Sequence, residues 1–249
     1  MEAFLSLLNQ DVLFKFSLLF ARILAFVAFM PVYGHTSVSP RVRVTFAFFI
    51  TTFLFPIVDV ENKITENMFV LSLITEITLG LVASFFVQMI FSAVRIIGEL
   101  IEYSTALSMA NMFDPSTGSQ QGIVNRFLYM VALVLFFETG MYEMTFTILV
   151  KSFSMIHLGE FNIFSYDGVK IVIDEINRLF AFAFSFALPL FFISFILDIY
   201  YGYGTRSMPA FSPFVITFQL KFGIIFLFLM FGMQIFADSF TNFFIDKFQ

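Results

Sequence analysis

The charged residues Arg95, Glu99 and Glu102 form the group whose spacing most directly suggests chemistry. Their spacing places all three on one face of a helix, where Arg95 can form an ion pair with Glu99. Buried carboxylates inside membrane helices also serve in proton relays. Both interpretations stay open, and we favour a structural or inter-subunit ion pair because buried paired charges commonly fix specificity.

Further charges lie inside otherwise apolar stretches, at Arg22, Glu76, Glu138, Glu143 and Lys221. Each would cost about 2.5 to 3.5 kcal/mol at the centre of a helix that faces lipid. We therefore expect these side chains to face protein. The candidates for ion pairs or assembly contacts are Arg22, Arg41, Arg43, Glu76, Arg95, Glu99, Glu102, Arg206 and Lys221.

Residue types that common enzymes and metal sites require are scarce. The chain has no cysteine, and its two histidines, His35 and His157, lie in different connections. No zinc spacing, P-loop, Gly-x-Ser-x-Gly elbow or dinucleotide fingerprint is present. The net charge of -5 includes no basic cluster that would attract nucleic acid. We expect no enzyme activity, no cofactor, no bound metal and no nucleic-acid partner.

The elements that carry these residues are helices in a membrane. Hydrophobic residues make up 59% of the 249-residue chain and charged residues 12%, whereas soluble domains are about half apolar and about a quarter charged. No polar block separates the apolar stretches, which predicts a single membrane domain, residues 1–249, of all-α class. The stretches are residues 12–30, 44–58, 68–94, 127–150, 179–197 and 214–237.

These stretches do not describe a simple six-span bundle. A spanning helix needs roughly 20 apolar residues, and the stretch at 44–58 is short. Pro189 should kink the stretch at 179–197. Gly80 and Ser84 have the small-xxx-small spacing that lets helix backbones approach closely, which suits packing against other subunits. If all six stretches crossed, five basic residues would fall on each side, so no orientation is indicated.

Residues 106–122, ALSMANMFDPSTGSQQG, form the most distinctive connection. Small residues surround Met109, Met112 and Phe113, and Asp114-Pro115 then ends the helical pattern. Methionine adapts its shape, so a Met/Phe cluster is suited to closing a pore around differing contents. An ordinary loop that folds against its own bundle is the alternative.

At these residues the chain resembles the FliR family of flagellar type III secretion, whose virulence counterparts are the SctT proteins. The resemblance is carried by MPVYG from Met30, SPRVR from Ser39, AVRIIGELI from Ala93 and ALSMANMFDP from Ala106. Asp198, Gly202, Arg206, Pro209 and Lys221 follow the family's C-terminal pattern. Pro209-Ala210 stands where the family often has Pro-Gln, and such differences leave flagellar and virulence systems open.

The resemblance implies a fold of helical hairpins, with a FliP-like part at about residues 1–165 fused to a FliQ-like part at about residues 166–249. It implies FliP-like, FliQ-like and FlhB-like partners in the bacterial inner membrane, at the flagellar basal body. The implied function is the export-gate pore for unfolded protein substrates. The implied gate or plug residues are Met109, Ala110, Asn111, Met112, Phe113, Asp114, Pro115, Gly118 and Gly122.

Two other functions compete with the export gate. The charges within apolar stretches also suit a small-solute or ion transporter, although transporters usually show internal repeats and paired broken helices. An intramembrane enzyme would need a nucleophile and a base within hydrogen-bond reach. The sequence shows no such pair.

Overall fold

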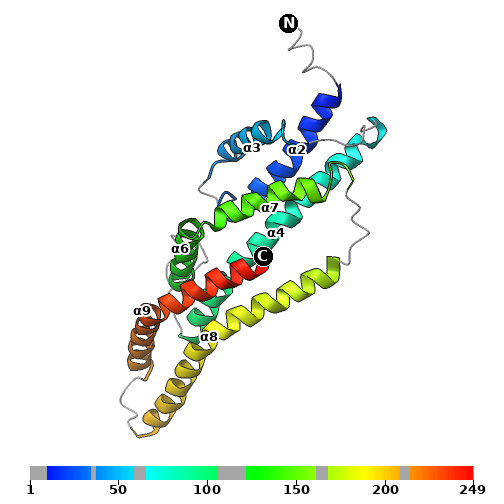
Figure 1. Cartoon of the computed structure of the whole chain (residues 1–249). Helices are drawn as coiled ribbons and strands as arrows, with labels where there is room; N and C mark the ends of the chain where they lie inside the picture. Colours follow the sequence, from blue (N-terminus) through cyan, green and yellow to red (C-terminus); the bar gives the residue numbers. More distant parts are fainter. Residues whose placement is uncertain are drawn as a thin grey trace. The chain divides into compact units, whose positions relative to one another are not determined.

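A computed structural model describes residues 10–34, 38–58, 66–105, 122–160, 168–207 and 213–248. The regular elements of these residues are all helices (Figure 1). The expected all-α membrane class is confirmed. The helices are α2 (Gln10–Phe29), α3 (Pro40–Leu54), α4 (Glu66–Ser104), α6 (Ile123–Glu138), α7 (Met141–Met155), α8 (Gly168–Ser207) and α9 (Pro213–Phe248).

Four described helices contain a segment long and apolar enough to cross a membrane: Gln10–Phe29, Met68–Ser104, Gly168–Gly204 and Gln219–Asp246. The helices α6 and α7 pass the same test only together, and they are bent by 68° at their junction. The apolar stretch at 127–150 is therefore two helices. Gly140 explains the break, because its φ of 73° lies in the left-handed region, which does not continue a right-handed helix.

The chain divides into two compact units, and each is described by itself. Unit 1 comprises Met1–Met89 and Tyr142–Val172, and unit 2 comprises Ile90–Met141 and Ile173–Gln249. The predicted FliP-like and FliQ-like parts are defined by likeness to other proteins, and they stay a prediction.

Unit 1 packs α2 against α3, the first part of α4 and α7. Gly80 of α4 lies directly against the backbone of α2, where an added Cβ would come within 2.8 Å of the Ala25 Cβ. This close approach agrees with the small-residue spacing noted in the sequence. Tyr33 stacks on Phe46 at 5.0 Å between ring centroids, and both rings also contact Phe146 of α7.

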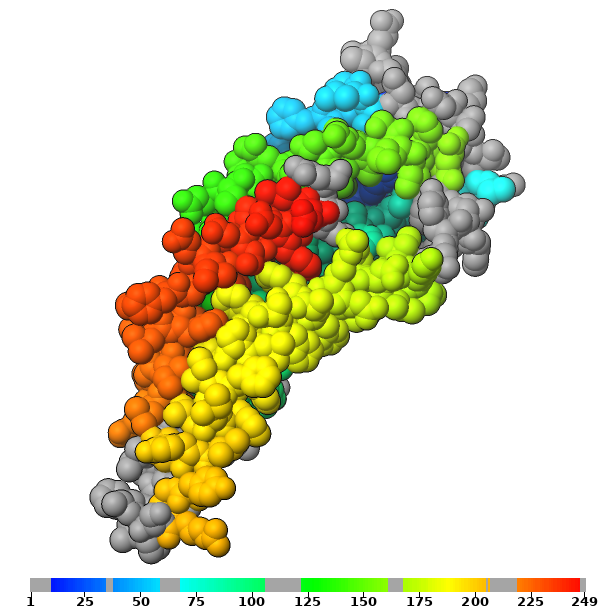
Figure 2. All heavy atoms as spheres, turned by 60° about the horizontal axis from the view of Figure 1, so that its bottom comes forward, coloured from blue at the N-terminus to red at the C-terminus, as the bar shows by residue number. Residues whose placement is uncertain are grey.

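Unit 2 holds an antiparallel hairpin of α8 and α9. Phe182 stacks on Phe243 at 4.5 Å and Phe186 contacts Phe236 at 5.2 Å, so contacts that move forward along α8 move backward along α9. Figure 2 shows α8 (yellow) lying alongside α9 (orange to red).

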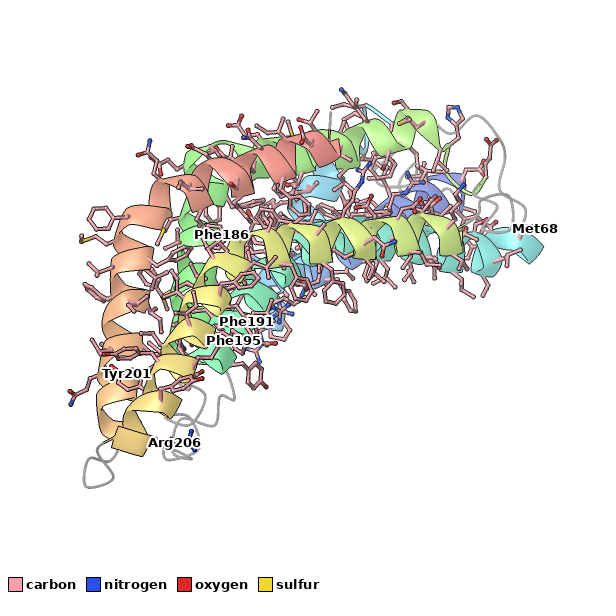
Figure 3. The ribbon with its side chains drawn as sticks, turned by 90° about the horizontal axis from the view of Figure 1, so that it is seen from below. Met68, Phe186, Phe191, Phe195, Tyr201 and Arg206 are labelled. Atoms are coloured by element: carbon pink, nitrogen blue, oxygen red, sulfur yellow. The ribbon has the colours of Figure 1, made fainter. Side chains whose placement is uncertain are left out.

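The expected kink in α8 is present within a continuous helix. Pro189 lies inside α8, and Figure 3 shows the ribbon changing direction between the labelled Phe186 and Phe191. Proline removes one backbone hydrogen bond and its ring displaces the preceding turn, which bends a helix without ending it.

Candidate functional site

The end of α4 and the start of α6 are joined through Glu102. This side chain is buried, and its Oε1 accepts a hydrogen bond from the backbone N–H of Asn125 at 3.0 Å. Gly122 occupies the N-cap of α6 and offers no side-chain cap. A Cβ at Gly122 would overlap the Glu102 carboxyl group, so glycine leaves the space that the carboxylate fills. Glu102 therefore caps α6 from another helix, where negative charge is favourable.

The last turn of α4 is held on its other side by α8 and α9. The Ser104 carbonyl oxygen accepts hydrogen bonds from Ser194 Oγ of α8 and from Lys221 Nζ of α9, the latter at 3.3 Å. Lys221 Nζ also lies 2.7 Å from Asp198 Oδ1. Positive charge at a helix C-terminus complements the helix dipole, and Asp198 supplies the counter-ion that a buried ammonium needs.

These contacts converge on the two flanks of residues 106–121. We call the group the polar base, and it consists of Glu102, Ser104, Asn125, Ser194, Asp198 and Lys221. The chain leaves the polar base at Thr105 and returns to it at Gly122, which is buried. The predicted gate residues from Met109 to Gly118 lie outside the described residues.

A second polar cluster lies inside unit 1 and centres on Arg22. Arg22 forms an ion pair with Glu76 at 2.5 Å, and both side chains are almost fully buried. Its other nitrogens donate to the carbonyl oxygens of Ser152 and Ile156, both at 3.1 Å. Glu76 also accepts from the Gly159 N–H at 2.8 Å. We call these residues the arginine cluster; it joins α2, α4 and the end of α7.

With both clusters described, comparison with known proteins gives the family. The sequence pattern of the bacterial export proteins, family 1, matches residues 13–246. The chain belongs to this family. Among proteins similar to it is the flagellar biosynthetic protein FliR of Bacillus subtilis (strain 168). That protein is 27% identical over 228 residues, which cover 90% of this chain and 88% of the relative.

Other FliR proteins are similar over comparable lengths. FliR of Aquifex aeolicus (strain VF5) is 25% identical over 244 residues, covering 97% of this chain and 93% of the relative. FliR of Escherichia coli (strain K12) is 28% identical over 200 residues, covering 80% and 76%. Recognition of a FliR-family protein of flagellum biogenesis and protein export is thereby confirmed.

The other charged candidates of this FliR-family chain lie outside the two clusters. Arg41, Glu99 and Arg206 are exposed, and Arg43 donates to the Val38 carbonyl oxygen at 2.9 Å. Arg95 donates to Ser92 Oγ at 3.4 Å. Within the described part of the chain no ion pair joins Arg95 to Glu99, and of the three residues only Glu102 enters the polar base.

The expectation that charges inside apolar stretches face protein is right for Arg22, Glu76 and Lys221, which are all buried. For Glu138 and Glu143, which are both exposed in the single chain, it stays a prediction. Their position follows from the break between α6 and α7. These two carboxylates flank a bend, where Tyr142 donates to Glu143 at 2.9 Å, and do not lie in the middle of a spanning helix.

Sequence reasoning missed Ser104, Asn125 and Ser194. The sequence does contain a pattern that could have indicated the α8 residues of the polar base. Ser194 and Asp198 are polar residues in an apolar region, and they lie four positions apart on one face of a helix. No local sequence pattern indicates Ser104 or Asn125, because they contribute backbone groups. The Ser104 carbonyl oxygen accepts from Ser194 and Lys221, and the Asn125 N–H donates to Glu102. Among the described residues no group of three His, Cys, Asp or Glu side chains is arranged to hold a metal.

Proposed function

We propose that this FliR-family chain is a subunit of the flagellar type III export gate. With FliP-like, FliQ-like and FlhB-like subunits in the bacterial inner membrane, it forms the pore through which unfolded flagellar substrates leave the cytoplasm. The chain acts without catalysing a reaction, and the energy for export comes from its partners. In this proposal residues 106–122, the gate segment, close the pore when no substrate is present.

The polar base is the observation that carries this proposal. A gate must move in its middle while its ends stay attached, and the polar base ties both flanks of the gate segment to α6, α8 and α9. Met109, Met112 and Phe113 supply apolar, adaptable side chains between these ends. A pliable hydrophobic constriction holds back ions by dewetting and still opens for a wide substrate.

The arginine cluster favours the gate over a solute transporter. Charges that bind a solute need free hydrogen-bonding capacity, but Arg22 donates to Glu76, Ser152 and Ile156, and Glu76 also receives the Gly159 N–H. These two buried charges satisfy each other and the backbone around them. Their placement in apolar helices is explained by packing, with no solute required.

The gate is tested by ion leak through the reconstituted complex. Deletion of residues 110–118, or replacement of Met109, Met112 and Phe113 together with glycine, should leave the complex assembled and raise the passive ion flux into vesicles without substrate. The physical reason is loss of the apolar constriction. Dye-loaded vesicles measure the flux, and co-purification of the partner subunits measures assembly.

Substitutions in the connection at residues 161–168 provide the control, since this connection also lies between two apolar stretches. They should leave the leak at the value of the unaltered complex. If the assembled deletion variant leaks no more than this control, residues 106–122 are an ordinary loop and the proposed gate is wrong.

A further inference from the structure

We propose that the exposed face of α6 docks a transmembrane helix of a neighbouring subunit, and that the apolar side of this helix carries a lysine or arginine that pairs with Glu138. The inference rests on the proposed function in one respect, because that function supplies the partner subunits. It adds the surface on this chain and the kind of helix that the surface fits.

One face of α6 is already used inside unit 2. The ring of Phe136 contacts Phe91 of α4 at 5.6 Å and Phe244 of α9 at 5.8 Å between centroids. The buried residues of α6 are Val124, Asn125, Leu128, Ala132 and Phe136. These contacts hold α6 against α4 and α9 and leave its opposite face exposed in the single chain.

The opposite face is a stripe of large apolar side chains, each between 45% and 66% exposed. They are Ile123, Phe127, Met130, Val134 and Phe137. Spacings of three and four residues place all five on one side of the helix. We call these residues the α6 stripe. In a membrane such a stripe is covered by lipid or by another helix, and the residues at its end distinguish the two.

Glu138 ends α6 beside the stripe. Its side chain is exposed, and no described residue forms a hydrogen bond or ion pair with its carboxylate. The helices α6 and α7 qualify only together, as one broken span or as a re-entrant pair. In either arrangement the bend that follows Glu138 lies inside the membrane. A carboxylate that faces lipid there is costly, and a cationic side chain of a partner helix offsets that cost.

The backbone at the bend also requires cover. The N–H of Thr139 donates to the Leu135 carbonyl oxygen at 2.9 Å and that of Gly140 to the Phe137 carbonyl oxygen at 3.4 Å, so the hydrogen-bond ladder of α6 ends here. Non-helical backbone at membrane depth is tolerated only where protein covers it or water lines it. Water would leave the α6 stripe uncovered, whereas a partner helix covers the stripe, the charge and the bend together.

Photo-cross-linking identifies the occupant. A benzophenone amino acid replaces Met130 or Val134 in the full-length chain, which is purified with its partner subunits. Illumination should join either position to an apolar helix of a different subunit. Mass spectrometry should find a lysine or arginine on that helix about one turn from the residue joined to Val134. Met155, which is 81% exposed in unit 1, is the control position and should not give this adduct.

Three cross-linking results overturn the proposal. They are adducts with lipid alone, adducts with a second copy of this chain, and adducts with a partner helix that has no basic residue near the joined position. The measurement leaves Glu138 unchanged, so it does not depend on whether a Glu138 variant folds.

Charge reversal tests the pairing itself. Glu138→Gln should weaken association with the cross-linked subunit by at least about tenfold, because the partner's charge is left buried and unpaired. Glu138→Lys should abolish association, and exchange of the partner's basic residue for glutamate should restore it. Glu99→Gln removes an exposed carboxylate of α4 and should change nothing. Undiminished association of Glu138→Lys, or a reversal that restores nothing, overturns the pairing.

Access of water to the bend is measured at Thr139→Cys, in a chain with no cysteine of its own. In the assembled complex this cysteine should stay unreactive toward a water-soluble maleimide, while Asp11→Cys reacts. Equal labelling of the two would show that water covers the bend, which overturns the docked helix.

The two proposals fail separately. If the partner subunits co-purify but α6 is joined to none of them, the docking surface is wrong and the export-gate function stands. A chain that purifies without any partner subunit refutes both.

Discussion

At the scale of single residues, the arginine cluster shows how charges are accommodated in a chain with few of them. Arg22 is buried, packs its guanidinium 4.4 Å from the centroid of the Phe153 ring, and donates to the last carbonyls of α7 and to Glu76. The guanidinium presents five donors in a planar fork, which a lysine ammonium cannot reproduce. The cluster therefore depends on arginine specifically, and not on positive charge alone.

Arg22→Leu should lower the free energy of unfolding by about 3 to 5 kcal/mol, because it leaves the buried Glu76 carboxylate without a counter-ion. Denaturation followed by helical circular dichroism measures the change, since the chain has no tryptophan. The double variant Arg22→Leu with Glu76→Leu should lose less than the sum of the two single losses. Arg41→Leu, at an exposed arginine, should change little; a loss there equal to that of Arg22→Leu would contradict the cluster.

At the scale of elements, contact between helix backbones depends on particular glycines. Gly80 lies against Ala25 and Phe26 of α2, and Gly98 lies against Asn125 of α6. A side chain at either position would push apart two helices that are otherwise in backbone contact. The arginine cluster spans the same α2–α4 contact as Gly80, so a change in that spacing also disturbs the ion pair of Arg22 and Glu76.

Gly80→Leu should destabilise unit 1 by about 1 to 3 kcal/mol through overpacking. Its matched control is Gly223→Ala in α9, where an added Cβ meets nothing within 4 Å. That change should be neutral or should stabilise the helix by about 0.5 to 1 kcal/mol, because alanine favours helix over glycine. Thermal unfolding of the two purified variants compares them. Equal stability of Gly80→Leu and the unaltered chain would show that α2 and α4 are not in close contact.

At the scale of the whole molecule, the number of crossings is set by helix length. The 15 residues of α3 extend over only about 22 Å at 1.5 Å per residue, less than the hydrocarbon core of about 30 Å. The 20 residues of α2 are long enough to cross. By this length, α3 is too short to cross, and we predict that the apolar stretch at 44–58 is not a separate crossing.

Single cysteines at Asp11, Ser39 and Ile57, labelled with a membrane-impermeant maleimide, should show this directly. Asp11 and Ser39 should react from opposite sides because α2 lies between them. Ser39 and Ile57, which is exposed after the end of α3, should react from the same side because α3 is too short to cross. Reaction of Ser39 and Ile57 from opposite sides would restore a six-span bundle.

The sequence by itself determined the class of the protein and the environment of several charges. Its apolar composition required membrane helices, and the cost of a charge in lipid correctly predicted that Arg22, Glu76 and Lys221 face protein. The small-residue spacing marked Gly80 for packing against other subunits, whereas Gly80 packs within the chain against α2. The sequence also identified Pro189 as a kink and the FliR family from local motifs. These properties depend on composition or on residues close together in the chain, so a single sequence is enough to predict them.

Only the tertiary structure decided which partners these residues meet. Glu76 is 54 residues from Arg22 and Lys221 is 117 residues from Ser104, and no local pattern specifies such distant pairs. Glu102 was assigned to a helical face with Arg95 and Glu99, yet it caps α6 because the chain returns there and Gly122 leaves room. Spacing along one helix shows which side chains can reach one another on that helix. Burial against other helices decides which of these side chains forms a contact.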